Sequence, residues 1–89
     1  MNYTVRKESA DDYTPVLYQN GRYRVIECRD GIQWVIQKAK KTGRGREWRG
    51  FGYCRTSAAL IGIWSACTGE TAPPELDCLP DRIEGGLAR

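Results

Sequence analysis

The residues with the clearest capacity for chemistry are cations in the middle of the chain. Six lysines and arginines occupy the glycine-containing stretch from residue 38 to residue 49: Lys38, Lys40, Lys41, Arg44, Arg46 and Arg49. Cations on a flexible glycine-rich loop suit contacts with phosphates, which position a protein on nucleic acid without reading its sequence. The stretch lacks the Gly-Lys-Ser/Thr ending of a nucleotide-binding P-loop. It therefore predicts binding to an anionic partner, and a solvated loop is the alternative.

The charge distribution along the chain agrees with this interpretation. The net charge is +3, yet residues 21–55 hold ten basic and three acidic groups, while both ends of the chain are mildly acidic. A cationic block of this kind favours nucleic acid or an acidic protein face as the partner.

Catalytic residue patterns are missing from the sequence. There is no histidine, the usual acid–base partner of a serine or cysteine nucleophile. The carboxylates fall in expected turns and tails with no spacing that pairs them: Asp11, Asp12, Glu75, Asp77 and Asp81. We therefore expect a non-enzymatic protein without a cofactor.

The four cysteines, Cys28, Cys54, Cys67 and Cys78, lack the short intervals of a zinc knuckle. We expect no metal site and buried free thiols, as in a cytoplasmic protein. A disulfide among the last three cysteines is the alternative.

The strongest structural signal is a β-hairpin in which Asp30-Gly31 separates two β-branched and aromatic runs, 23–28 and 32–37. A two-residue loop would pair Ile26 with Val35 and spread polar groups over both faces. A three-residue loop pairs Ile26 with Trp34 and gathers the apolar residues on one face, so we favour the second register.

Further elements surround this hairpin. A short strand is expected at 16–19, before the Asn20-Gly21 turn signal, and another at 48–54, after the basic loop. The spacing of Leu60, Ile63, Trp64 and Cys67 predicts a helix with Thr56 as its N-cap and Gly69 as its end. Gly62 inside this helix suggests close packing on the sheet.

The expected fold is α+β, with an antiparallel three- to four-stranded meander packed on one main helix. We expect a single domain over residues 1–89, with a core at about 16–69 and an acidic tail at 70–89. No apolar run reaches the ~20 residues of a membrane span, and no secretion signal is evident, so a cytoplasmic location is expected.

The sheet face away from the helix is expected to carry many aromatic residues, among them Tyr18, Tyr23, Phe51 and Tyr53. One alternative is that the N-terminal arm or the C-terminal tail covers this face. The other is that it is exposed, as a partner or homodimer interface or as a stacking platform for bases.

Two families resemble parts of the chain. The Tyr23-Arg24 start, Trp34, the Phe51–Cys54 strand, the Thr56 cap and the pattern Ala59-Leu60…Ile63-Trp64 resemble the ethylene-response-factor type DNA-binding domain. That resemblance implies three strands, a helix and DNA contact through the sheet face away from the helix. The family's arginines on that face are replaced here by Glu27, Gln33, Val35 and Gln37.

The second resemblance involves residues 22–34 and 48–56, which are similar to small proteins of alphaproteobacteria and their prophages. Proteins from that setting include anti-CRISPR inhibitors, which block a host nuclease complex by occupying a protein or nucleic-acid surface. The resemblance implies a stand-alone inhibitor whose partner is a host CRISPR effector or its nucleic-acid-binding surface. A small DNA- or RNA-binding module is the alternative.

Overall fold

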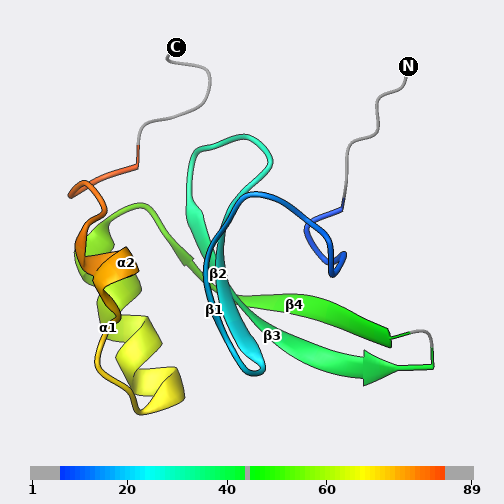
Figure 1. Cartoon of the computed structure of the whole chain (residues 1–89). Helices are drawn as coiled ribbons and strands as arrows, with labels where there is room; N and C mark the ends of the chain where they lie inside the picture. The colour runs from blue at the N-terminus through cyan, green and yellow to red at the C-terminus, as the bar shows by residue number, and fades with distance from the viewer. Residues whose placement is uncertain (1–6, 44, 84–89) are drawn as a thin grey trace.

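A computed structural model describes residues 7–43 and 45–83 of the chain. Four antiparallel strands form a meander in the order β1-β2-β3-β4, and helices follow the last strand (Figure 1). The strands are β1 (Val16–Asn20), β2 (Tyr23–Glu27), β3 (Trp34–Thr42) and β4 (Gly45–Cys54), and the helices are α1 (Ser57–Thr68) and α2 (Pro74–Asp77). The predicted α+β meander with one main helix is therefore confirmed.

The β1–β2 hairpin lies where the Asn-Gly signal placed it, with the turn shifted by one residue. Asn20 pairs with Tyr23, so Gly21 and Arg22 form the turn. The φ of Gly21 is +61°. A positive φ at the first turn position favours glycine, which explains why this residue ends the strand.

The register that we favoured for the β2–β3 hairpin is wrong. Ile26 pairs with Val35 and Glu27 with Trp34, which is the register that we set aside. The backbone N–H of Cys28 donates to the carbonyl of Gln33, so residues 29–32 form the loop. Gly31 adopts the expected left-handed conformation within that loop, with a φ of +70°.

The physical reason for this register is a pair of buried polar side chains. Arg24 and Gln37 face each other across the two strands, and Nε of Arg24 donates to Oε1 of Gln37 at 2.7 Å. Because each polar group has a partner, its burial carries no large penalty. A count of apolar residues on each face could not have predicted that these two polar side chains would bond to each other.

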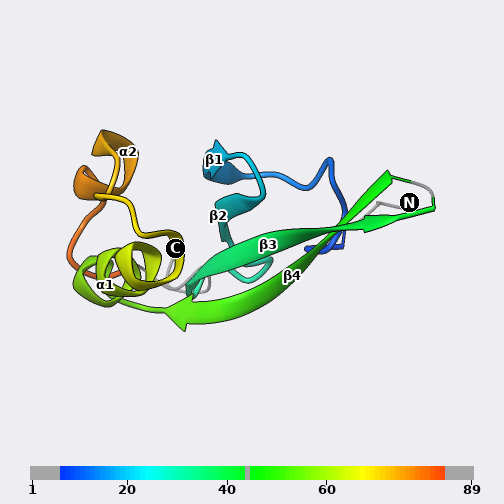
Figure 2. The ribbon, with the colours of Figure 1, turned by 90° about the horizontal axis from the view of Figure 1, so that it is seen from below.

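The basic stretch expected as a loop is mostly sheet. Strand β3 continues to Thr42 and β4 begins at Gly45, and Thr42 pairs with Gly45 at the tip. The two strands run past the rest of the molecule as a two-stranded ribbon (Figures 1 and 2). The lysines and arginines are therefore held on alternating sides of a ribbon instead of moving freely on a loop.

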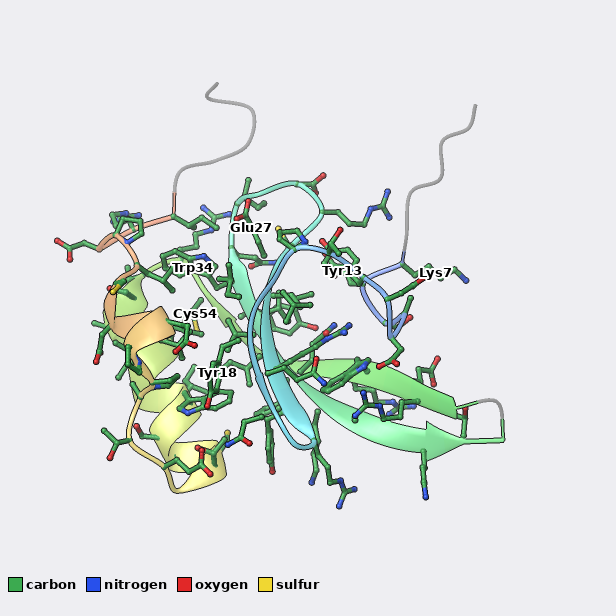
Figure 3. The ribbon with its side chains drawn as sticks, viewed as in Figure 1. Lys7, Tyr13, Tyr18, Glu27, Trp34 and Cys54 are labelled. Atoms are coloured by element: carbon green, nitrogen blue, oxygen red, sulfur yellow. The ribbon has the colours of Figure 1, made fainter. Side chains whose placement is uncertain are left out.

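The main core lies between the sheet and the helices. Its buried members include Trp34 and Ile36 from β3, Leu60 and Trp64 from α1, and Leu76 from α2. We call this side of the sheet the helix side. Side chains of Tyr18, Trp34 and Cys54 lie beside α1 in Figure 3.

The opposite side of the sheet is covered by residues 7–13, which we call the N-terminal segment. Tyr13 packs there against Ile26, Cys28 and Val35, and its hydroxyl donates to the carbonyl of Glu27 at 2.7 Å. Of the alternatives left open by the sequence, coverage by the N-terminal arm is the one observed. The shielding of Ile26 by the helix, which the favoured register required, is not observed.

Helix α1 has the predicted ends. The Thr56 side chain accepts from the N–H of Ala59, and Gly69 ends the helix with a φ of +73°. Cys67 is exposed instead of buried, and the space around Gly62 is open, so Gly62 does not mark close packing. In the part of the chain that the structure describes, no helix has the length and apolar character needed to cross a membrane.

A bulge in β4 places Gly50 and Gly52, two residues apart, on different sides of the sheet. Ile36 pairs with Gly52 while Gln37 pairs with Gly50, which leaves Phe51 as the extra residue. A Cβ on Gly52 would lie 3.1 Å from Ile63 of α1, whereas one on Gly50 would lie 2.5 Å from the Tyr53 hydroxyl. Only Gly52 therefore serves the close approach of the helix.

Candidate nucleic-acid interface

The predicted cations gather on one projecting feature, which we call the outer ribbon. It consists of residues 38–42 of β3 and 45–49 of β4, joined by the tip. Five of the six predicted cations lie on it and are exposed: Lys38, Lys40, Lys41, Arg46 and Arg49. Arg44 falls outside the described residues.

The strand register divides these cations between the two sides of the ribbon. Side chains alternate along a strand, so Lys38 and Lys40 lie on the helix side, together with Arg49, which pairs with Lys38. Lys41 pairs with Arg46, and both lie on the opposite side. Each side of the outer ribbon thus presents positive charge to solvent.

The helix side also carries aromatic groups where the ribbon meets the body of the protein. The Tyr23 and Phe51 rings make an edge contact, with centroids 6.1 Å apart. The Lys38 ammonium lies 5.7 Å from the centre of the Tyr23 ring, within the range of a cation–π interaction. Phe51 is 42% exposed, so an exposed apolar side chain lies next to the cationic surface of the outer ribbon.

The four predicted aromatic residues do not form one face. Tyr18 and Tyr23 pack edge-on against Trp64, with centroid distances of 5.5 and 6.3 Å, and they belong to the helix-side core. Tyr53 is 57% exposed and pairs with Val35 on the opposite side. Only Phe51 and Tyr53 are therefore available to a partner, on different sides of the sheet.

On the opposite side, the N-terminal segment reaches the base of the outer ribbon. Asp11 Oδ1 accepts from Trp48 Nε1 at 2.8 Å and lies 3.2 Å from the Arg46 guanidinium. The Trp48 hydrogen bond is the largest influence lowering the pKa of Asp11; Arg46 and Arg24 act in the same direction, and burial opposes them. Arg46 also lies 5.1 Å from the Trp48 ring centre, so this cation is held in place from two directions.

Sequence reasoning missed the residue that organises this region, Arg24. Its side chain is fully buried, and its Nη atoms donate to the carbonyls of Glu8, Ala10 and Asp11 at 3.0, 2.8 and 3.2 Å. Its guanidinium also lies 4.3 Å from the centre of the Trp48 ring. Burial is the largest influence on the pKa of Arg24 and lowers it.

These contacts join the N-terminal segment to the sheet. Gln37 Nε2 donates to the Glu8 carbonyl at 2.9 Å, and the Trp48 backbone N–H donates to the Ser9 carbonyl at 3.0 Å. Figures 1 and 2 both show the N-terminal segment beside β3 and β4, where the outer ribbon joins the rest of the sheet. The acceptors that receive the Arg24 and Gln37 donors are backbone carbonyls, which every residue has, so no residue pattern could have revealed them.

The cysteines are separate from the cationic surface. All four are free thiols, with Cys28 and Cys54 buried and Cys67 and Cys78 exposed. Burial raises the pKa of Cys54, which keeps that thiol in its neutral form. Within residues 7–43 and 45–83, no group of three or more cysteine or carboxylate side chains is close enough to hold a metal ion.

The arrangement can bind anions on a support of paired strands. The cations stand on paired strands, and the inner ends of those strands are part of both cores. Comparisons of the chain with protein-family models, with curated proteins and with solved structures found no match.

Proposed function

We propose that this protein is a non-enzymatic binding protein that holds nucleic acid through its outer ribbon. The observation that carries the proposal is the presence of five exposed lysines and arginines on both sides of a projecting two-stranded ribbon. Glu47 is the one acidic residue of the ribbon, and it lies opposite Lys40. This excess of positive charge complements a phosphate backbone.

Binding of this kind has a measurable signature. Each phosphate neutralised by a lysine or arginine releases counterions, so the logarithm of affinity falls with the logarithm of salt concentration, at about −0.9 per contact on duplex DNA. Contact through most of the ribbon cations gives a slope of roughly −3 to −4. The affinity should therefore drop steeply with moderate added salt.

The test is a fluorescence anisotropy titration with duplex DNA, single-stranded DNA and RNA at several salt concentrations. The variant Lys40→Ser/Lys41→Ser/Arg46→Ser should weaken binding and flatten the salt dependence. The matched control, Arg29→Ser/Arg55→Ser/Arg82→Ser, removes the same charge from exposed arginines away from the ribbon and should bind more like the parent. Failure to bind any nucleic acid at low salt would refute the proposal.

A second candidate function is inhibition of a host CRISPR effector complex, as the prophage resemblance implies. The observation that favours it is the exposure of Phe51 and Tyr53 on β4, a strand that also carries ribbon cations, since aromatic residues and arginine are enriched at protein interfaces. Both candidate roles place the protein in the cytoplasm. This role is tested by pull-down with purified effector complexes and by a target-cleavage assay. Undiminished target cleavage by every type of CRISPR effector complex would refute it.

A further inference from the structure

The outer ribbon is exposed to an unusual degree for a pair of strands. Beyond Ala39 and Trp48, the residues on both of its sides are exposed, and these include Lys40, Lys41, Arg46 and Glu47. A two-stranded ribbon on its own is only marginally stable in water, because it has no apolar layer to bury. A ribbon whose two sides are both exposed and charged is suited to insertion into a partner.

The distribution of charge limits what that partner can be. Lys38, Lys40 and Arg49 point to one side of the ribbon, and Lys41 and Arg46 to the other. A flat anionic surface would meet only one of these sets. A groove bounded by two phosphate backbones can meet both sets at once.

Dimensions then select the groove. Two paired strands have axes about 4.8 Å apart, and with their side chains they fit the major groove of B-form DNA, about 12 Å wide. The minor groove, about 6 Å wide, is too narrow for them. The major groove of duplex RNA is deep and narrow and excludes protein elements.

The N-terminal segment determines which side faces the bases. On the opposite side it covers the base of the ribbon, where Trp48 is 1% and Ala39 is 5% exposed. The segment would collide with a groove floor on that side. The helix side has no such cover over Lys38, Lys40 and Arg49, which are all exposed.

We propose that the outer ribbon enters the major groove of double-stranded DNA with its helix side toward the base edges. Arg49, Lys38 and Lys40 then face the groove floor, where arginine and lysine pair with the O6 and N7 acceptors of guanine. Lys41 extends from the other side toward the flanking phosphates, and Arg46, whose guanidinium also pairs with Asp11, lies opposite it on the paired strand. This inference rests on the proposed nucleic-acid binding and names its form; the contact surface differs from the sheet face away from the helix.

The first test compares three probes of one sequence at a single low salt concentration: a DNA duplex, an RNA duplex and single-stranded DNA. The DNA duplex should bind at least roughly tenfold more tightly than the other two. Equal binding of all three would overturn the groove inference and leave nucleic-acid binding intact. Binding of none would overturn both and would point to an acidic protein surface as the partner.

A second test identifies the groove directly. Methylation of guanine N7, which lies in the major groove, should reduce binding of the DNA duplex. A minor-groove ligand such as netropsin should not displace the protein. Displacement by netropsin, or indifference to N7 methylation, would contradict the inference.

Paired variants then separate the two sides of the ribbon. Lys38→Ser/Lys40→Ser/Arg49→Ser should abolish the preference for the DNA duplex over single strands. Lys41→Ser/Arg46→Ser should weaken all three probes to a similar degree and retain the preference. An unchanged melting temperature confirms that each variant is folded, and the reverse pattern of preference would overturn the assigned orientation.

Discussion

Replacing Arg24 with methionine removes a guanidinium that donates to three backbone carbonyls of the N-terminal segment and to the buried Gln37 side chain. The lost bonds run to Gln37 Oε1 and to the carbonyls of Glu8, Ala10 and Asp11, at 2.7 to 3.2 Å. Hydrogen bonds to a charged group contribute about 1.5–3 kcal/mol each. These four share one guanidinium, and the carbonyls can regain water, so the contributions are not additive.

We therefore expect Arg24→Met to lower the free energy of unfolding by about 3–5 kcal/mol, the range for breaking a buried charged network. A small domain has about 5–15 kcal/mol in total. The melting temperature should accordingly fall by at least roughly 10 °C. Arg24→Lys should fall between the parent and Arg24→Met, because one ammonium cannot reproduce the planar fork of donors.

Urea unfolding followed by tryptophan fluorescence measures the loss, and hydrogen exchange reports whether residues 7–13 are released. The matched control is Arg22→Met, which removes an exposed arginine from the neighbouring turn and should change stability by at most about 0.5 kcal/mol. The double variant Arg24→Met/Gln37→Met should recover part of the loss, since no unpaired amide remains. A loss below about 1 kcal/mol for Arg24→Met would refute this account of the network.

Four other changes test the packing and the titrating groups. Gly62→Ala should raise the free energy of unfolding by about 1 kcal/mol in a thermal melt, because the added Cβ meets open space on a helix, and a decrease would mean that this surface is covered. Trp64→Ala should lower it by about 3–5 kcal/mol in urea, since Trp64 is fully buried; an unchanged midpoint would contradict its place in the core. Burial raises the pKa of Tyr13 from 10.0 to about 12, so its contribution to stability is complete below pH 10 and is lost as the pH rises toward 12; Tyr13→Phe should remove this alkaline loss in pH-dependent melts. The pKa of Asp11 is lowered from its usual value of 3.8, so the Asp11 carboxylate contributes to stability above that pH and this contribution is lost as the pH falls through and below it. Asp11→Asn should therefore make the melting temperature less sensitive to acid. Equal sensitivity in both proteins would remove Asp11 as a cause.

Local signals in the sequence were sufficient for much of the fold. The Asn20-Gly21 pair marked the first hairpin within one residue, and Thr56 and Gly69 marked both ends of α1. Turns and caps depend on the conformational preferences of single residues, so they can be recognised without knowledge of the rest of the chain. The cationic stretch could also be recognised from the sequence, because its charges lie close together along the chain, although its strands were taken for a loop.

Features that depend on contacts distant in sequence could not be recognised. The β2–β3 register follows from the pairing of Arg24 with Gln37, and this pair is tolerated because the N-terminal segment supplies three further acceptors. The glycines at 43 and 45 indicated a loop, yet the pairing of β3 with β4 extends as far as Thr42 and Gly45. The four aromatic residues expected on one face do not share one, because a change of one residue in register exchanges the two sides of a strand.

The shared strands β3 and β4 have a consequence for how the chain can vary. Paired residues added or removed at the tip near Gly43 would lengthen or shorten the reach of the ribbon and leave the pairing of Trp34 with Cys54 and of Ile36 with Gly52 unchanged. A single residue inserted between Gln37 and Lys38 would instead turn Lys38 and Lys40 to the other side. Reach can thus evolve almost freely, whereas the sidedness of the charges is tied to the spacing at the base.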